Sequence, residues 1–158
     1  GEVDEMSQFT KILIPTDGSE NTLPAITTGL ALAKQMNAEV TALYVVDQTA
    51  FVNFSMDSTI VSIFSLLEKE GKAAVSYIES EGEKLGVKVT SKILEGSPSK
   101  KIIEEAKEND LIVMGTLGRS GISKLLLGSV AERVVRYSPC PVLIIRSPQE
   151  KEDADDKN

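Results

Sequence analysis

The sequence predicts an α/β protein in which one open, five-stranded parallel sheet carries helices on both faces. Short apolar runs alternate with segments of helical periodicity along the chain, and this alternation implies parallel strands joined by crossover helices. The runs at 11–15, 111–114 and 141–145 are apolar over nearly their whole length, as expected for strands buried on both faces. The 158 residues suffice for one domain with a sizeable core.

The first half of the chain contains two predicted strands and two predicted helices. The strands cover 11–15 and 39–46, and apolar residues at helical spacing predict a helix from about 21 to 36 between them. After a loop, a long helix is expected over 58–85. Gly71 and Gly82 each weaken that helix by ~1 kcal/mol relative to alanine, which predicts a break or kink.

The next part of the chain predicts an edge strand followed by a helix. Apolar and polar residues alternate over 87–94, which is typical of a strand with one wet face or at the edge of a sheet. Ser97 followed by Pro98 indicates a helix start, and this helix is expected to reach about Asn109.

The last predicted helix lies between the strands at 111–114 and 141–145. Ser129 and Glu132 have the spacing of a capping box, which marks the first turn of a helix. The apolar stripe that follows consists of Val130, Val134 and Tyr137.

Composition excludes several classes of function. A formal net charge of -7 argues against nucleic acid or an anionic membrane as the main partner. Histidine is absent, so Ser-His-Asp and Cys-His nucleophile systems are excluded. Cys140 is the only cysteine, so we expect a packing role for it and a reducing, cytoplasmic location for the protein. We expect a flexible segment over 1–8, a domain over 9–147 and a disordered acidic tail over 148–158.

Glycines and positive charge gather after the strand at 111–114. Gly115 and Gly118 follow the carboxyl end of a buried parallel strand, where open α/β sheets bind ligands. Arg119 could place a planar cation against phosphate oxygens. Gly128 precedes a helix start, which carries unpaired amides and roughly half a positive charge. The stretch therefore indicates a phosphate site, with Lys124 as a further candidate contact.

A simpler interpretation remains open at this point. The glycines could serve only tight turns, Ser129 only its own helix, and Lys124 only the solvated surface. Neither a P-loop pattern nor G-x-G-x-x-G is present.

The combination of motifs resembles the nucleotide-binding subgroup of the universal stress protein family. Its glycine signature, G-x2-G-x9-G-[ST], is similar to Gly115, Gly118, Gly128 and Ser129. The segments "KILIPTDGSE", "LYVVD" and "GSVAERVVRYSPCPVLIIR" resemble the family's opening strand and turn, the end of its second strand and its closing helix and strand. The resemblance covers roughly residues 9–147. It implies a Rossmann-like fold, similar to adenine nucleotide alpha hydrolases, with strand order 3-2-1-4-5.

The resemblance also implies a ligand and a site for it. ATP, or AMP or ADP in its place, would lie across the ends of the first and fourth strands. Pro15, Thr16 and Asp17 would line the adenosine side, and Val45 would meet the base through its backbone. The ribose and phosphates would be surrounded by Met114, Gly115, Gly118, Arg119, Gly128, Ser129 and Val130. Magnesium or manganese would accompany the phosphates, with Asp17 as a candidate metal contact; its alternative role is an ordinary Asp-Gly turn.

The resulting hypothesis is an ATP-binding regulatory protein of a stress response, with little or no turnover and with unknown protein partners. One alternative is a slow Mg-dependent ATPase related to adenylate-forming hydrolases, although "TDGSEN" departs from their S-G-G-x-D-S loop. Another is a dimeric interaction module that binds no nucleotide. The strand at 141–145 would lie at the sheet edge, where its unpaired backbone groups favour pairing with a second copy. The resemblance likewise implies a homodimer.

Overall fold

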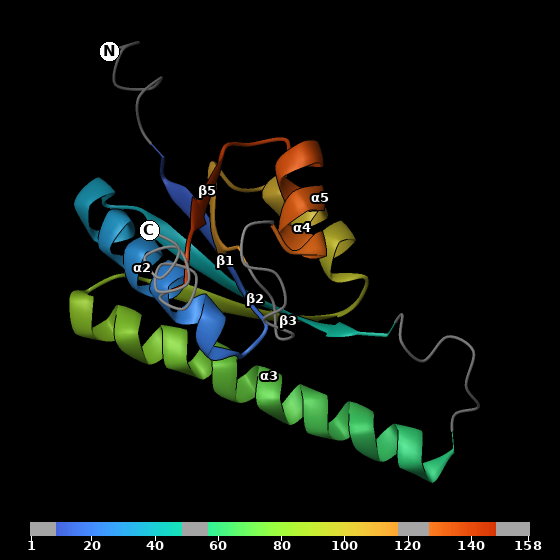
Figure 1. The fold of residues 1–158 in the computed structure, drawn as a ribbon. Coiled ribbons are helices and arrows are strands. Elements are labelled where there is room, and N and C mark those ends of the chain that lie inside the picture. Colours follow the sequence, from blue (N-terminus) through green and yellow to red (C-terminus); the bar gives the residue numbers. More distant parts are fainter. Residues whose placement is uncertain (1–8, 49–56, 117–126, 148–158) are drawn as a thin grey trace, which may run out of the picture.

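Five parallel strands form one sheet with the order β3-β2-β1-β4-β5. The computed structural model describes residues 9–48, 57–116 and 127–147 (Figure 1). The strands are β1 (Lys11–Thr16), β2 (Glu39–Asp47), β3 (Val89–Gly96), β4 (Leu111–Gly115) and β5 (Val142–Ile145). The predicted parallel sheet and its strand order are confirmed. The expected flexible start and acidic tail lie outside the described residues.

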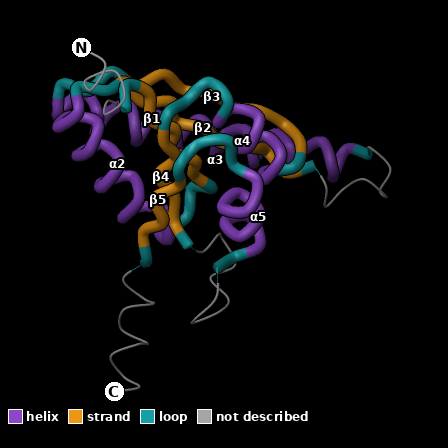
Figure 2. Tube along the Cα trace, turned by 90° about the horizontal axis from the view of Figure 1, so that it is seen from above, coloured by secondary structure: helices purple, strands orange, loops and turns teal. Residues whose placement is uncertain are grey.

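Two helices cover each face of the sheet (Figure 1). On one face lie α2 (Leu23–Met36), which follows the short 3-10 turn η1 (Glu20–Thr22), and α3 (Ser58–Leu85). On the other face lie α4 (Pro98–Ala106) and α5 (Ser129–Tyr137). In Figure 2, α2 and α5 are seen on opposite sides of β4 and β5.

The core is divided into two layers by the alternation of side chains along the strands. In β1, Ile12 and Ile14 point toward α2 and α3, whereas Leu13 between them packs with residues of α4 and α5. All three side chains are fully buried. This is the pattern expected of a central strand in a doubly covered sheet.

The helix α3 runs unbroken through Gly71 and Gly82, so the break considered at these glycines is absent. Both residues are buried, and a Cβ atom at Gly71 would lie 2.6 Å from Cδ1 of Tyr44. At Gly82 it would lie 2.5 Å from Cγ2 of Val89. The glycines therefore let the helix lie close against β2 and β3, and this packing outweighs their low helix propensity.

Two elements have bounds that differ from those predicted from the sequence. The third strand begins at Val89 rather than at residue 87, because the amide of Val87 donates to the carbonyl of Gly82 (2.8 Å) and belongs to the helix end. The helix α4 ends at Ala106 rather than near Asn109. No helix within the described ranges combines the length and apolar character that crossing a membrane requires.

The amino ends of β1 and β4 are joined by one carboxylate. Oδ2 of Asp110 accepts hydrogen bonds from the backbone amides of Thr10 and Lys11 (both 2.9 Å) and from the Thr10 hydroxyl (3.0 Å). Burial disfavours the charged carboxylate, but these hydrogen bonds outweigh that effect and lower the pKa of Asp110 below its ordinary value.

We predict that an Asp110→Asn substitution reduces stability at neutral pH and much less in acid. The folded-state pKa is lowered, so the charged form stabilises the fold above about pH 4, and this contribution disappears as the pH falls through the folded pKa. Urea unfolding at several pH values should show the two proteins converging below about pH 4. A constant difference at all pH values would contradict this role.

Candidate functional site

Hydrogen-bonded pairing between β1 and β4 stops before their carboxyl ends, and we call this unpaired stretch the opening. Pairing of β1 with β2 continues to Thr16 and Tyr44, and pairing of β4 with β5 continues to Gly115 and Ile145. Between β1 and β4, however, the paired residues are only Ile12 with Leu111 and Leu13 with Ile112. Over their last residues β1 and β4 are therefore not paired with each other, although each remains paired with its other neighbour. This is the point at which the strand order reverses.

The cause of this opening is the missing amide hydrogen of Pro15. The Thr10 carbonyl accepts from the amide of Glu39, the first residue of β2, and the Lys11 carbonyl accepts from the amide of Asp110, just before β4. Since alternate residues of a parallel strand face the same neighbour, residues 11, 13 and 15 face β4. The next bond of this ladder would run from the amide of residue 15 to the carbonyl of Val113, and proline cannot donate it.

A network of hydrogen bonds shapes the loop that follows β1. The Thr16 hydroxyl lies 3.0 Å from the Thr22 hydroxyl and accepts a hydrogen bond from the amide of Gly18 (3.0 Å). The Thr22 hydroxyl donates to the carbonyl of Ser19 (2.8 Å). Oδ1 of Asp17 accepts from the amide of Ser19 (2.9 Å). The turn role considered for Asp17 is therefore present in the structure.

The start of α5 lies at the other side of the opening. The amide of Gly128 donates to the carbonyl of Thr116 (2.7 Å), which fixes the helix start beside the end of β4. The first three helical amides, of residues 129–131, have no acceptor within their own helix. A helix start with such amides attracts anions.

The predicted capping box at this helix start is wrong. The N-cap residue is Gly128, and no side chain caps the helix, because Ser129 is already its first helical residue. Glu132 instead forms an ion pair with Arg136 (3.3 Å). Tyr137, which was expected on the apolar stripe, is 59% exposed, and the buried side chains of α5 are Ala131 and Val134.

The structure brings most of the predicted site residues to one edge of the sheet. Pro15, Thr16 and Asp17 lie at the end of β1 and just beyond it, Val45 near the end of β2, Met114 and Gly115 at the end of β4, and Gly128, Ser129 and Val130 at the start of α5. Gly118, Arg119 and Lys124 lie outside the described residues.

Two of these residues can meet a ligand mainly through their backbone. The side chain of Met114 is 5% exposed and packs in the core layer against α4 and α5. Val45 is partly buried and packs against the same layer. The expected backbone role of Val45 is consistent with this burial.

One polar atom in the loop after β1 was not selected from the sequence. Oγ of Ser19 is buried without a hydrogen-bond partner in the structure, although Ser19 occupies the N-cap position of η1. An unpaired buried hydroxyl is costly, so such an atom marks a place where a ligand or water could bind. A serine after Asp-Gly reads as a turn residue, and only the tertiary environment reveals its burial.

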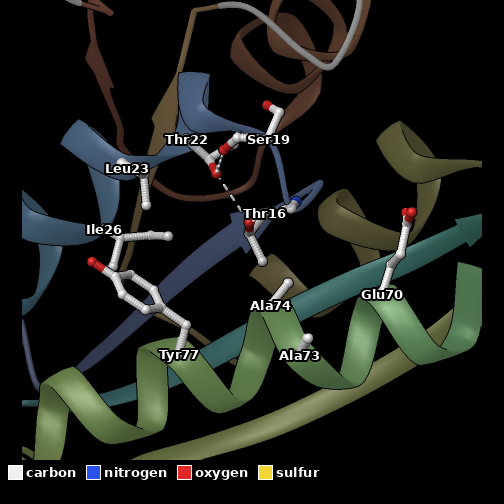
Figure 3. A pocket seen from close by; sticks show the side chains of 10 residues that line it. Thr16, Ser19, Thr22, Leu23, Ile26, Glu70, Ala73, Ala74 and Tyr77 are labelled. Carbon is white, nitrogen blue, oxygen red and sulfur yellow. Dashed lines mark hydrogen bonds between the residues drawn. The ribbon is translucent and has the colours of Figure 1, made fainter.

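The sheet edge also has a cavity on the side of α2 and α3. It lies between α3 and the loop after β1 and has a volume of about 380 Å³ (Figure 3). Among the predicted site residues only Thr16 lines it. Over the described part of the chain, no three His, Cys, Asp or Glu side chains gather as a metal-binding group.

The strand order, the helices on both faces and the opening at the reversal of strand order together define a Rossmann-like class of α/β fold. Comparison with known proteins narrows this class. The model of the universal stress protein family matches residues 8–146. The chain therefore belongs to the universal stress protein family.

Individual relatives agree with this assignment. Universal stress protein MJ0531 of Methanocaldococcus jannaschii is 43% identical over 145 residues, which cover 90% of this chain and 85% of that protein. The solved universal stress protein UspA from Lactobacillus plantarum is 30% identical, with a TM-score of 0.74, over 89% of this chain and 99% of that one. A universal stress protein solved in complex with cAMP is 25% identical, with a TM-score of 0.67, again over 89% and 99% of the two chains.

We predict that Pro15→Ala extends the ladder between β1 and β4. The new hydrogen bond would add about 0.5–1.5 kcal/mol, whereas the greater freedom of the unfolded chain would cost about 0.4–1 kcal/mol, so stability should change little. The diagnostic measurement is hydrogen exchange, in which the amide of residue 15 should be strongly protected. Pro98→Ala, at the first turn of α4, is the matched control. Fast exchange at residue 15 would show that proline does not cause the opening.

Proposed function

We propose that this protein binds an adenine nucleotide across the carboxyl ends of β1 and β4, and that the bound nucleotide regulates its contacts with other proteins. ATP is the proposed ligand, with ADP or AMP as alternatives at the same site. The observation that carries the proposal is the opening between β1 and β4 with the uncapped start of α5 beside it. Ligands of open α/β sheets bind at such a reversal of strand order.

The charge distribution explains how an acidic protein could hold a polyanion. With a net charge of -7, the protein as a whole repels phosphate. The free amides of residues 129–131 and the helix dipole supply a local positive potential. Gly128 has no side chain to cover these amides, so we assign the phosphates to Gly128, Ser129 and Val130, together with Gly115, Gly118 and Arg119.

The adenosine side is assigned to the residues at the ends of β1 and β2. Pro15, Thr16 and Asp17 would line it, and the backbones of Val45 and Met114 would complete it. The buried hydroxyl of Ser19, which has no partner, is a further candidate contact. The relative solved with cAMP supports an adenine nucleotide as the ligand class.

We propose that turnover is slow or absent. Histidine is absent from the chain, and the Asp17 carboxylate accepts a hydrogen bond from the amide of Ser19 within its own turn. A carboxylate so placed orients the loop. Magnesium or manganese would be held chiefly by the phosphates, because no other carboxylate joins Asp17 in a metal-binding group among the described residues.

A Gly128→Val substitution should lower ATP affinity at least tenfold. The branched side chain would cover amides that bind phosphate, and each hydrogen bond to a charged group contributes about 1.5–3 kcal/mol. The backbone of Gly128 has φ -62° and ψ 160°, which valine adopts without strain. Calorimetric titration of ATP into both proteins measures the effect.

Ser97→Val provides the matched control, because Ser97 is the N-cap residue of α4 and also makes no side-chain cap bond. It should leave ATP affinity unchanged. Equal affinity of Gly128→Val and the wild type would favour the interaction module that binds no nucleotide. Phosphate release that rises with protein concentration and disappears in Asp17→Asn would favour the slow ATPase.

We also propose a homodimer through the strand at 141–145. This strand lies at the edge of the sheet, and Leu143 on it is 37% exposed. The Pro141 carbonyl accepts from Ile112 of β4, so alternate residues 141, 143 and 145 face β4 and residues 142 and 144 face outward. The outward backbone groups could pair with the same strand of a second copy.

Ile144→Pro should convert such a dimer to a monomer while the sheet stays intact, because it removes an amide that faces away from β4. Ile144→Val keeps the amide and is the control. Light scattering coupled to size-exclusion chromatography measures the mass, and circular dichroism checks the fold. A dimer that persists in folded Ile144→Pro would place the interface elsewhere.

A further inference from the structure

The cavity between α2 and α3 has its own walls and is distinct from the opening between β1 and β4. One turn of α3 forms its floor, with Ala73 and Ala74 between Glu70 and Tyr77 (Figure 3). The loop after β1 and the first turn of α2 form the opposite wall. The space exists because two alanines occupy the α3 positions that face this loop, whereas larger side chains stand one turn to either side.

Two large apolar side chains of the cavity are partly exposed to solvent. Leu23 is 39% exposed and Tyr77 is 42% exposed, and both line the cavity together with the buried Ile26. Tyr77 lies across from Leu23 and Ile26 in Figure 3. An apolar or aromatic body placed there would remove large hydrophobic side chains from water.

The two threonine hydroxyls of the cavity are set up as acceptors, whereas the Ser19 hydroxyl, which also lines the cavity, has no hydrogen-bond partner. The Thr22 hydroxyl gives its hydrogen to the Ser19 carbonyl (2.8 Å), so in its 3.0 Å contact with Thr16 the Thr16 hydroxyl is the donor. Both hydroxyl hydrogens are therefore already donated within the protein. The oxygens of Thr16 and Thr22 can still accept a hydrogen bond from a ligand. The carboxylate of Glu70 adds a charged acceptor, and no Lys or Arg of the described part of the chain lines the cavity.

We propose that this cavity is a second binding site, and that its ligand is an organic cation: a protonated amine, amidinium or guanidinium group on an apolar or aromatic body. The cationic group would donate to Glu70 or to the threonine oxygens, and the ring of Tyr77 would attract it through its π face. The net charge of -7 favours cations further. The same carboxylate would repel phosphate, which separates this site chemically from the proposed nucleotide site.

The test uses three probes of nearly the same shape and different charge. Benzamidinium is cationic, benzamide is neutral and benzoate is anionic. Titration of each into the ¹⁵N-labelled 158-residue protein should give an affinity order of cation, neutral molecule and anion. The amide shifts should concentrate at Thr16, Gly18, Thr22, Ala74 and Tyr77. Equal affinity for all three probes, or shifts spread over the surface, would overturn the proposal.

Variants assign the binding to this cavity. Glu70→Gln should weaken benzamidinium binding about threefold to fivefold and leave benzamide unaffected, as expected for a partly exposed ion pair. Ala73 is exposed on α3, so Ala73→Leu should fill the cavity without disturbing the core and abolish binding of both probes. Ser76→Leu adds the same side chain at an exposed position of α3 outside the cavity and should bind as the wild type does. Unchanged binding in Ala73→Leu would overturn the assignment.

One further variant separates this proposal from the nucleotide site, because Thr16 and Ser19 line the cavity and are also assigned to the nucleotide site. Gly128→Val should retain benzamidinium binding within about twofold, since Gly128 does not line the cavity. Loss of benzamidinium binding in Gly128→Val would place the cation in the nucleotide opening and refute the second site. Loss of ATP binding with retention of benzamidinium binding is the expected result.

Discussion

The pairing of β1 with β4 is the constraint on which the site depends. At their amino ends the two strands are joined through Asp110, which accepts from two amides and one hydroxyl of Thr10 and Lys11. At their carboxyl ends the ladder stops at Leu13 and Ile112, because Pro15 has no amide hydrogen to continue it. The strands β1 and β4 are thus hydrogen-bonded at their amino ends and unpaired with each other at their carboxyl ends. The unpaired ends lie where the strand order reverses.

A local positive potential in an acidic protein follows from the same arrangement. The chain carries 24 acidic and 17 basic residues, so any attraction for phosphate must come from fixed backbone dipoles and a few placed cations. The bond from Gly128 to Thr116 brings the start of α5 to the end of β4. Because no side chain caps this helix, its first amides are left for another acceptor.

The loop after β1 has two faces with opposite chemical character. It follows the unpaired end of β1, and the amides at the start of α5, beside the end of β4, would receive an anion. Toward α3 it borders the cavity, where hydroxyl oxygens, Glu70 and the ring of Tyr77 offer acceptors.

The sequence by itself determined the alternation of strands and helices, because apolar periodicity and turn residues are local signals. The strand order was predicted from its resemblance to the universal stress protein family. It also indicated Gly115, Gly128 and Pro15 as site residues. Only the tertiary structure decided that Gly128 rather than Ser129 caps α5 and that α3 runs through Gly71 and Gly82. It also decided that the hydroxyl oxygen of Ser19 is buried and that Ala73 and Ala74 leave a cavity. These features arise from contacts between segments far apart in the chain, which a pattern of neighbouring residues does not encode.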